Sequence, residues 1–183
     1  PVDAVVLATG FVSTSFLAPM RITGLGGREL DGEWRQGAQA YRGITVAGFP
    51  NLFLLYGPNT NLGHNSIVFM IECQVNYVVQ AVRTMIASDL AWIDVRPEAM
   101  EAWNRRLQRE LGRTVWARTP ASWYKTKDGR ITNNWSGSTT RYWIATRKFD
   151  GENYVERERS ADPGESGLST SPGPQGAARP AAA

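Results

Sequence analysis

The sequence predicts an α/β fold, and three observations support that prediction. Two short runs rich in β-branched and apolar residues, Val2–Leu7 and Leu52–Tyr56, are typical of strands buried on both faces of a parallel sheet. Helical apolar periodicity follows the second run, over residues 65–87. Among the 183 residues, 42% are hydrophobic and 20% are charged, which suits one globular unit with its own core.

The first predicted strand, Val2–Leu7, ends at Ala8-Thr9-Gly10. The carboxyl end of a strand is where an α/β sheet places its ligand crevice, so Thr9 and Gly10 are candidate ligand contacts. Taken alone, three such common residues more often form an ordinary strand-to-loop turn. Because the chain starts at Pro1, inside this strand-like run, we expect it to be a fragment of a longer protein.

Residues 20–41 are rich in glycine and polar residues. Their apolar anchors are few and scattered, so we expect a partly ordered excursion with a weak helix or hairpin, held by Ile22, Leu25, Leu30 and Trp34. The turn at residues 48–51 then introduces the second strand, Leu52–Tyr56.

Two amphipathic helices are predicted after the strands. In the first, over about residues 65–87, only Gln74 interrupts the apolar i, i+3, i+4 spacing. The second starts at Pro97, a residue favoured in the first helical turn, and ends at Gly112. The apolar face of the first helix comprises Ile67, Met70, Ile71, Tyr77, Val78, Ala81, Val82 and Met85, and that of the second comprises Met100, Trp103, Leu107 and Leu111.

The C-terminal part changes character. Residues 116–149 alternate aromatic and polar side chains, which predicts short strands and loops on the outside of the core. From about Ser160 the chain is dominated by Pro, Gly, Ser and Ala. This composition buries too little apolar surface to offset chain entropy, so residues 160–183 are predicted to be disordered.

The turn between Tyr56 and the first long helix has the strongest signature of a binding site. Gly57 leaves room for a planar ligand against the backbone, and Pro58 fixes φ as the chain leaves the strand. No acidic residue occupies the first helical turn, so free N–H groups and the positive dipole end face this turn. A flavin gains negative charge on reduction, which a helix N-terminus stabilises by about 0.3–2 kcal/mol. The polar residues crowded here are Asn59, Thr60, Asn61, Asn65 and Ser66.

The same turn has a second interpretation. Asn and Ser side chains commonly cap helix N-termini themselves. The spacing alone does not decide between a bound cofactor and a helix that caps itself.

Other site chemistry has little support. His64 is the only histidine, and the adjacent residues at a helix start, Ser66 included, rarely point at it. No Gly-x-Ser-x-Gly elbow occurs, so a hydrolase is excluded. One cysteine and one histidine exclude a disulfide framework and the usual zinc sites, and Cys73 is expected to be a small buried hydrophobe. We therefore predict no catalytic residue and no metal ligand.

Aromatic residues between 116 and 143 are interleaved with Lys and Arg, a pattern that can stack bases and bind phosphate. Aromatic residues in strands more often pack, and a net charge of +3 is small for this role, so we expect no nucleic-acid partner. No run of about 18 apolar residues occurs, so we expect no membrane span and a cytoplasmic location.

Two segments resemble the flavin-containing monooxygenases, and most closely their Baeyer–Villiger branch of the hydroxyacetophenone-monooxygenase type. They are DAVVLATGF at 3–11 and GFPNLFLLYGPNTNLGHNS at 48–66. The resemblance extends from Pro1 to about Tyr154. Shorter matching pieces are Ser122-Trp-Tyr, Gly129-Arg130, Asn134-Trp-Ser-Gly137 and Thr146-Arg147.

The resemblance implies the C-terminal part of a flavoprotein with two dinucleotide-binding domains, the NADPH domain being inserted within the FAD domain. Residues 1–12 would be the closing strand and linker from the NADPH domain. Residues 13–159 would be the C-terminal part of the FAD domain with peripheral strands and loops, and residues 160–183 the disordered tail.

The resemblance also implies site residues. His64 and Ile67 would face the substrate. Trp123 would lie near a loop that covers NADPH in ring-ketone relatives, although this chain lacks the Pro-Gly-Lys pattern of that loop. The implied FAD contacts are Thr9, Gly10, Gly57, Pro58, Asn59, Thr60, Asn61, Leu62, Gly63, His64, Asn65 and Ser66.

The activity implied is that of an FAD- and NADPH-dependent monooxygenase. NADPH reduces the flavin, O2 adds at C4a, and the peroxyflavin passes one oxygen atom to a ketone. The alternatives are an N- or S-oxygenating relative and a non-catalytic binding module. Because the chain holds no Gly-x-Gly-x-x-Gly turn, both pyrophosphate-binding turns would lie in a missing N-terminal portion, and we expect the isolated chain to be inactive.

Overall fold

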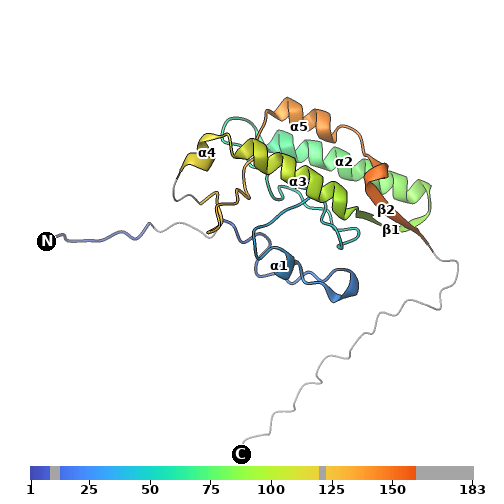
Figure 1. Ribbon diagram of the computed structural model, residues 1–183, viewed down its shortest axis with the longest axis horizontal. Coiled ribbons are helices and arrows are strands. Elements are labelled where there is room, and N and C mark those ends of the chain that lie inside the picture. The colour runs from blue at the N-terminus through green and yellow to red at the C-terminus, as the bar shows by residue number, and fades with distance from the viewer. Residues whose placement is uncertain (9–12, 120–122, 160–183) are drawn as a thin grey trace, which may run out of the picture.

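The computed structural model describes residues 1–8, 13–119 and 123–159 (Figure 1). The predicted turn at Thr9 and Gly10 and the predicted disorder of 160–183 lie outside these residues. Three longer helices, α2, α3 and α5, occupy one side of the view, and the segment with α1 lies on the other. No helix in the described ranges is long and apolar enough to cross a membrane.

The long helix predicted from periodicity is confirmed as α2, Ile67–Ala87. The polar residue that interrupts its apolar stripe, Gln74, is fully buried and bonds to Tyr142 and to the amide of Tyr56. The interruption is therefore an internal hydrogen-bonding position. The other buried residues of α2 are Met70, Cys73, Tyr77 and Ala81.

The second predicted helix is confirmed as α3, Pro97–Leu111, with Gly112 as its C-cap. Two further helices follow, α4 (Val115–Arg118) and α5 (Thr139–Thr146). The Ser138 hydroxyl caps α5 by accepting a hydrogen bond from the Arg141 amide.

The segment predicted to lie outside the core does not do so. Trp135 and Tyr142 are buried within it, and they pack against Leu62, Met70, Leu107, Leu111 and Ile131 in a second hydrophobic cluster. The prediction of exterior strands and loops over 116–149 is wrong for these residues. Tyr142 lies on the short helix α5, which contacts α2 and buries Thr139, Tyr142 and Thr146.

The sheet consists of β1 (Leu90–Val95) and β2 (Tyr154–Glu158), which pair antiparallel with Leu90 opposite Glu158 and Val95 opposite Tyr154. Neither strand was expected from the sequence. The first hydrophobic cluster packs these strands against α2 and against residues 30–54.

The two predicted strands are wrong. Residues 1–8 form no strand, and the side chains of Val2, Val5, Val6 and Leu7 are between 75% and 87% exposed. Leu52–Tyr56 has no ladder pairing and bends at its last two residues; Leu54 is buried and its amide donates to the Ile44 carbonyl. A strand buried on both faces needs neighbouring strands, and the described residues supply none to either run.

The excursion at 20–41 is as predicted. It contains the 3₁₀ turn η1 (Leu25–Gly27), the short helix α1 (Leu30–Glu33) and a bridge between Thr23 and Glu29. Of the expected anchors, Leu30 and Trp34 are buried and Leu25 is exposed. A last 3₁₀ turn, η2 (Gly151–Asn153), leads into β2.

Candidate functional site

A cavity of about 280 Å³ lies beside the turn at Tyr56 and Gly57. It brings together three residues that the sequence singled out, Gly57, Asn61 and Trp123, from segments more than sixty positions apart. Aromatic rings and amide groups dominate its walls. The full lining is Ser13, Phe16, Tyr56, Gly57, Asn61, Trp123 and Asn133.

Hydrogen bonds hold the walls of this cavity in place. The Tyr56 hydroxyl donates to Asn61 Oδ1 at 3.0 Å, and burial raises the pKa of Tyr56, so the phenol stays a donor. The Asn133 side-chain amide donates to the Ser13 carbonyl at 3.3 Å, and the Ser13 hydroxyl donates to the carbonyl of Trp123. Ser13 thus links the segment that carries Trp123 to the segment that carries Asn133, and all three residues line the cavity.

A contact within the chain gives position 57 its own reason to be glycine. A Cβ at Gly57 would come within 2.3 Å of the Gly43 carbonyl oxygen. A Cβ at Gly43 would in turn come within 2.2 Å of the Thr60 methyl group. Close contact between two segments of this chain therefore requires glycine at both positions, and the approach of a ligand to Gly57 stays a prediction.

Asn59 and Thr60 point into the protein. Asn59 is buried, and its side-chain amide donates to the carbonyls of Ile131 and Asn134 at 2.8 and 3.0 Å. The Thr60 hydroxyl donates to the Gly57 carbonyl at 2.7 Å. The Asn59 side chain thus joins the turn to residues 131 and 134, whereas the Thr60 side chain closes the turn on itself. Pro58 and Leu62 are buried as well, and the cofactor contacts predicted for these four residues stay predictions.

The predicted row of free backbone amides is wrong at three positions. The Tyr56 amide donates to Gln74 Oε1 at 2.8 Å. The amides of Asn59 and Asn61 donate to the carbonyls of Thr132 and Asn133 at 2.7 and 2.9 Å. Residues 59–61 and 132–135 thus form a short parallel pairing, and these donors are not offered to a ligand.

At the start of α2 the structure shows the self-capping alternative. The Ser66 hydroxyl accepts a hydrogen bond from the Phe69 amide at 3.2 Å, and Asn65 Oδ1 accepts one from the Ser66 amide at 2.7 Å. The stretch Gly63–Ser66 is exposed, and Ile67 is half-buried. The predicted substrate residues His64 and Ile67 do not line the cavity beside Tyr56.

The cavity fits a ring but not a whole dinucleotide. Small-molecule sites usually enclose about 300–1,000 Å³, so 280 Å³ is at the lower limit. Phe16, Tyr56 and Trp123 offer aromatic surface to a planar group, and Asn61 and Asn133 offer amide donors and acceptors to its polar edge. The lining therefore has the chemistry to contact a planar ring and its polar edge.

Four residues of this lining were missed in the sequence: Ser13, Phe16, Tyr56 and Asn133. Tyr56 lies inside the matching motif at 48–66, and Asn133 directly precedes the matching piece that begins at Asn134. Their positions in or beside these motifs could have identified them. Tyr56 also has a positive φ of 59°, an uncommon backbone conformation for a bulky residue, which no residue pattern reveals. Cys73 is buried as predicted, and burial raises the pKa of its thiol.

Comparison with known proteins gives consistent relatives. An FAD-binding monooxygenase of Aspergillus niger is 46% identical over 145 residues, which cover 76% of this chain and 24% of that protein. A Baeyer–Villiger monooxygenase of Pseudomonas aeruginosa is 43% identical over 155 residues, 84% of this chain and 29% of that protein. One of Streptomyces coelicolor is 40% identical over 83% of this chain and 30% of that protein. No protein-family model matches.

Solved structures give the same picture for the fold. An oxidized steroid monooxygenase bound to NADP matches with a TM-score of 0.65 and 25% identity, over 76% of this chain and 27% of that one. A cyclohexanone monooxygenase from Rhodococcus sp. Phi1 bound to NADP+ matches with a TM-score of 0.65 and 20% identity, over the same 76%. The chain thus spans between about a quarter and a third of the length of these proteins.

Proposed function

Since this chain is a homologue of the Baeyer–Villiger and FAD-binding monooxygenases over part of their length, we propose that the whole protein is an FAD- and NADPH-dependent monooxygenase. The substrate proposed is a ketone, into which one oxygen atom of O2 is inserted. The observation that carries the proposal is the identity of 43–46% with two monooxygenases over most of this chain. The division at residues 12 and 159 and the cytoplasmic location stay predictions.

In this proposal the cavity beside Tyr56 receives part of a cofactor ring. The flavin, when bound, would supply the oxygen-transfer chemistry, and this chain would position and shield it. Tyr56 and Trp123 would contact the ring faces and exclude water, while Asn61 and Asn133 would bond to its polar edge. Contacts from Thr9, Gly10, Gly63–Ser66 and Ile67 stay predictions, because their side chains lie outside this cavity or outside the described residues.

The exposed apolar side chains of α2 support the proposal that this chain is part of a larger protein. Val68, Val75, Val79, Val82 and Ile86 are exposed, at successive spacings of seven, four, three and four residues. Such spacing forms a continuous apolar seam along a helix, interrupted here only by Glu72. We propose that the seam packs against the N-terminal portion of the same protein, since the relatives are three to four times as long as their match to this chain.

Two other functions stay as alternatives. An N- or S-oxygenating enzyme would use the same cofactors on a soft heteroatom. A non-catalytic binding module would lack the two glycine-rich pyrophosphate turns upstream of Pro1. The upstream reading frame separates the module from the enzymes, and the oxygenated product separates the two enzymes.

The test compares the longer gene product with this chain alone. The longer product is expected to retain FAD through a desalting column and to oxidise NADPH in the presence of a ketone, with an ester or lactone as product. The isolated chain is expected to lose FAD on the column, because its cavity holds only a ring. A sulfoxide from a thioether without any ester indicates the heteroatom enzyme. A longer product without flavin contradicts the proposal.

A further inference from the structure

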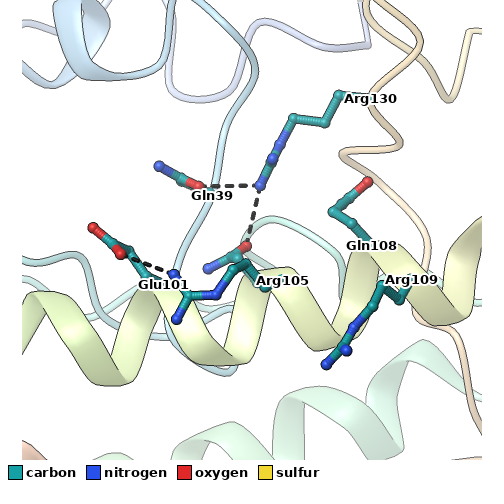
Figure 2. A pocket seen from close by; sticks show the side chains of 7 residues that line it. Gln39, Glu101, Arg105, Gln108, Arg109 and Arg130 are labelled. Carbon is teal, nitrogen blue, oxygen red and sulfur yellow. Dashed lines mark hydrogen bonds and ion pairs between the residues drawn. The ribbon is translucent and has the colours of Figure 1, made fainter.

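A second cleft, of about 700 Å³, lies between α3 and residues 125–131 and shares no residue with the cavity beside Tyr56. Figure 2 shows Arg130 reaching toward α3 from one side and Gln39 approaching from another. Unlike the first cavity, its lining is charged and amide-rich. The lining residues are Gln39, Glu101, Asn104, Arg105, Gln108, Arg109 and Arg130.

The guanidinium of Arg130 is held without a carboxylate. Its Nη2 donates to Gln39 Oε1 at 3.1 Å and to Asn104 Oδ1 at 3.3 Å, and its Nε is buried without a partner. Burial lowers the pKa of Arg130, as expected for a charge moved out of water without a counter-ion. Because both acceptors are neutral, the positive charge of Arg130 remains uncompensated.

Two other arginines of the described residues have a carboxylate partner. Arg42 pairs with Asp150 at 2.7 Å, and Arg141 pairs with Glu110 at 2.5 Å. A structural guanidinium is usually neutralised in this way, since an unpaired charge costs free energy on burial. Arg130 departs from this pattern inside a cleft that is large enough for a ligand.

The surrounding side chains fix the guanidinium of Arg130. The Asn104 amide nitrogen donates to the carbonyls of Ala40 and Met100 at 3.1 and 2.8 Å, so its oxygen is left for Arg130. The stem of Arg130 lies against Gly37, where a Cβ would come within 2.9 Å of Arg130 Cδ. The donor is therefore preorganised before any ligand binds.

The charged side chains that line this face of α3 give the cleft a net positive charge. Glu101 pairs with Arg105 at 3.0 Å, and Arg109 forms no ion pair within the described residues. Three guanidinium groups and one carboxylate give the cleft a net charge of two positive units at neutral pH. Figure 2 shows Arg109 extending away from Arg130, so it contributes long-range attraction, whereas Arg130 and Arg105 supply direct donors.

We propose that this cleft binds the phosphate group of a small molecule, with Arg130 as its principal donor. A dianionic phosphate matches the two net positive charges. Because both protons of Arg130 Nη2 are committed to Gln39 and Asn104, Nη1 would donate to the phosphate oxygens in a charge-assisted hydrogen bond. Gln39 and Asn104 orient Arg130, and Arg105 exchanges between Glu101 and the ligand.

The test is calorimetric titration of the 183-residue chain with inorganic phosphate at low ionic strength. The variants are Arg130→Gln and Arg109→Gln; Arg83→Gln, an exposed arginine on α2 outside the cleft, is the matched loss of charge. We expect saturable binding that Arg130→Gln weakens about tenfold or more, because a charged hydrogen bond is lost. We expect Arg109→Gln to weaken phosphate binding about threefold and Arg83→Gln to weaken it less than twofold.

Circular dichroism and melting temperature establish that each variant is folded. If Arg130→Gln does not fold, the comparison of phosphate affinity between Arg109→Gln and Arg83→Gln decides the test. Acetate is titrated in parallel and is expected to bind at least tenfold more weakly than phosphate. Equal weakening by Arg83→Gln and the cleft variants, equal affinity for acetate, or the absence of saturable binding overturns the proposal.

Discussion

At the scale of single residues, the Asp150 carboxylate is the centre of a hydrogen-bond network. It accepts hydrogen bonds from Tyr41 at 2.5 Å, from Tyr77, and from Arg42 at 2.7 Å. The Arg42 guanidinium also lies between 5.0 and 5.9 Å from the rings of Tyr41, Tyr77 and Trp103. The carboxylate thereby joins residues 41–42 and α2 to the segment that leads into β2.

We expect Asp150→Asn to lower the free energy of unfolding by about 3–5 kcal/mol, because it leaves a buried guanidinium without its counter-ion. Urea denaturation followed by tryptophan fluorescence measures the loss. Asp89→Asn is the control, since this aspartate is 79% exposed and its pair with Arg159 is 4.0 Å long, so its effect should stay below about 1 kcal/mol. Similar losses in the two variants would contradict the role of Asp150.

At the scale of elements, Glu110 connects the end of α3 to the start of α5. Its carboxylate accepts from Arg141 at 2.5 Å, from Ser136 at 2.6 Å and from Arg106 at 3.1 Å. Burial by itself raises the pKa of Glu110, but these hydrogen bonds outweigh it and lower the pKa from 4.5 to about 2. The folded state thus binds the ionised carboxylate more tightly than the unfolded chain does.

The stability that comes from Glu110 is therefore full above pH 4.5 and is lost as the pH falls toward 2. We expect Glu110→Gln to cost about 1–2 kcal/mol at pH 7, after solvent screening of the half-exposed arginines, and almost nothing near pH 2. Urea midpoints at pH 7, 4.5 and 2.5 give the profile. Glu101→Gln, in an exposed pair, should cost less than about 0.5 kcal/mol. A cost for Glu110→Gln that is independent of pH would contradict the assignment.

At the scale of the whole molecule, the apolar seam of α2 predicts different behaviour in this chain and in a longer product. Val75 is 42% exposed and Ile86 is 75% exposed. In this chain alone, Val75→Gln with Ile86→Gln should change the free energy of unfolding by less than about 1 kcal/mol, because both sites face water and glutamine is a good helix former.

In the longer product the same pair of substitutions should cost about 3–6 kcal/mol, since burying each of the two apolar side chains contributes about 1.5–3 kcal/mol. Chemical denaturation of both proteins measures the two costs. Val155→Gln on β2 is the control, being exposed but outside the seam. An equally small cost in both proteins would show that nothing packs on α2.

How much the sequence predicted differs between local and non-local structure. The extents of α2 and α3 followed from their apolar spacing, because i, i+3 and i+4 neighbours are decided within one helix. The strand β1 could not be recognised alone, because its partner β2 begins about sixty residues later and only the pairing defines the sheet. Val2–Leu7 and Leu52–Tyr56 had the composition of strands, but the described residues offer them no ladder partner.

For the site, the sequence by itself determined the family resemblance, the glycines at the critical turn and the position of Trp123 as a candidate. Only the tertiary structure decided which contacts those residues make within the chain: Gly43 packs so closely on Gly57 that a Cβ has no room, and the Asn59 amide donates to the carbonyls of residues 131 and 134. Residue identity records that a position is constrained, whereas the source of the constraint is a contact between distant segments. Such contacts exist only once the chain has folded, which is why Phe16, Tyr56 and Asn133 became neighbours of Trp123 only in three dimensions.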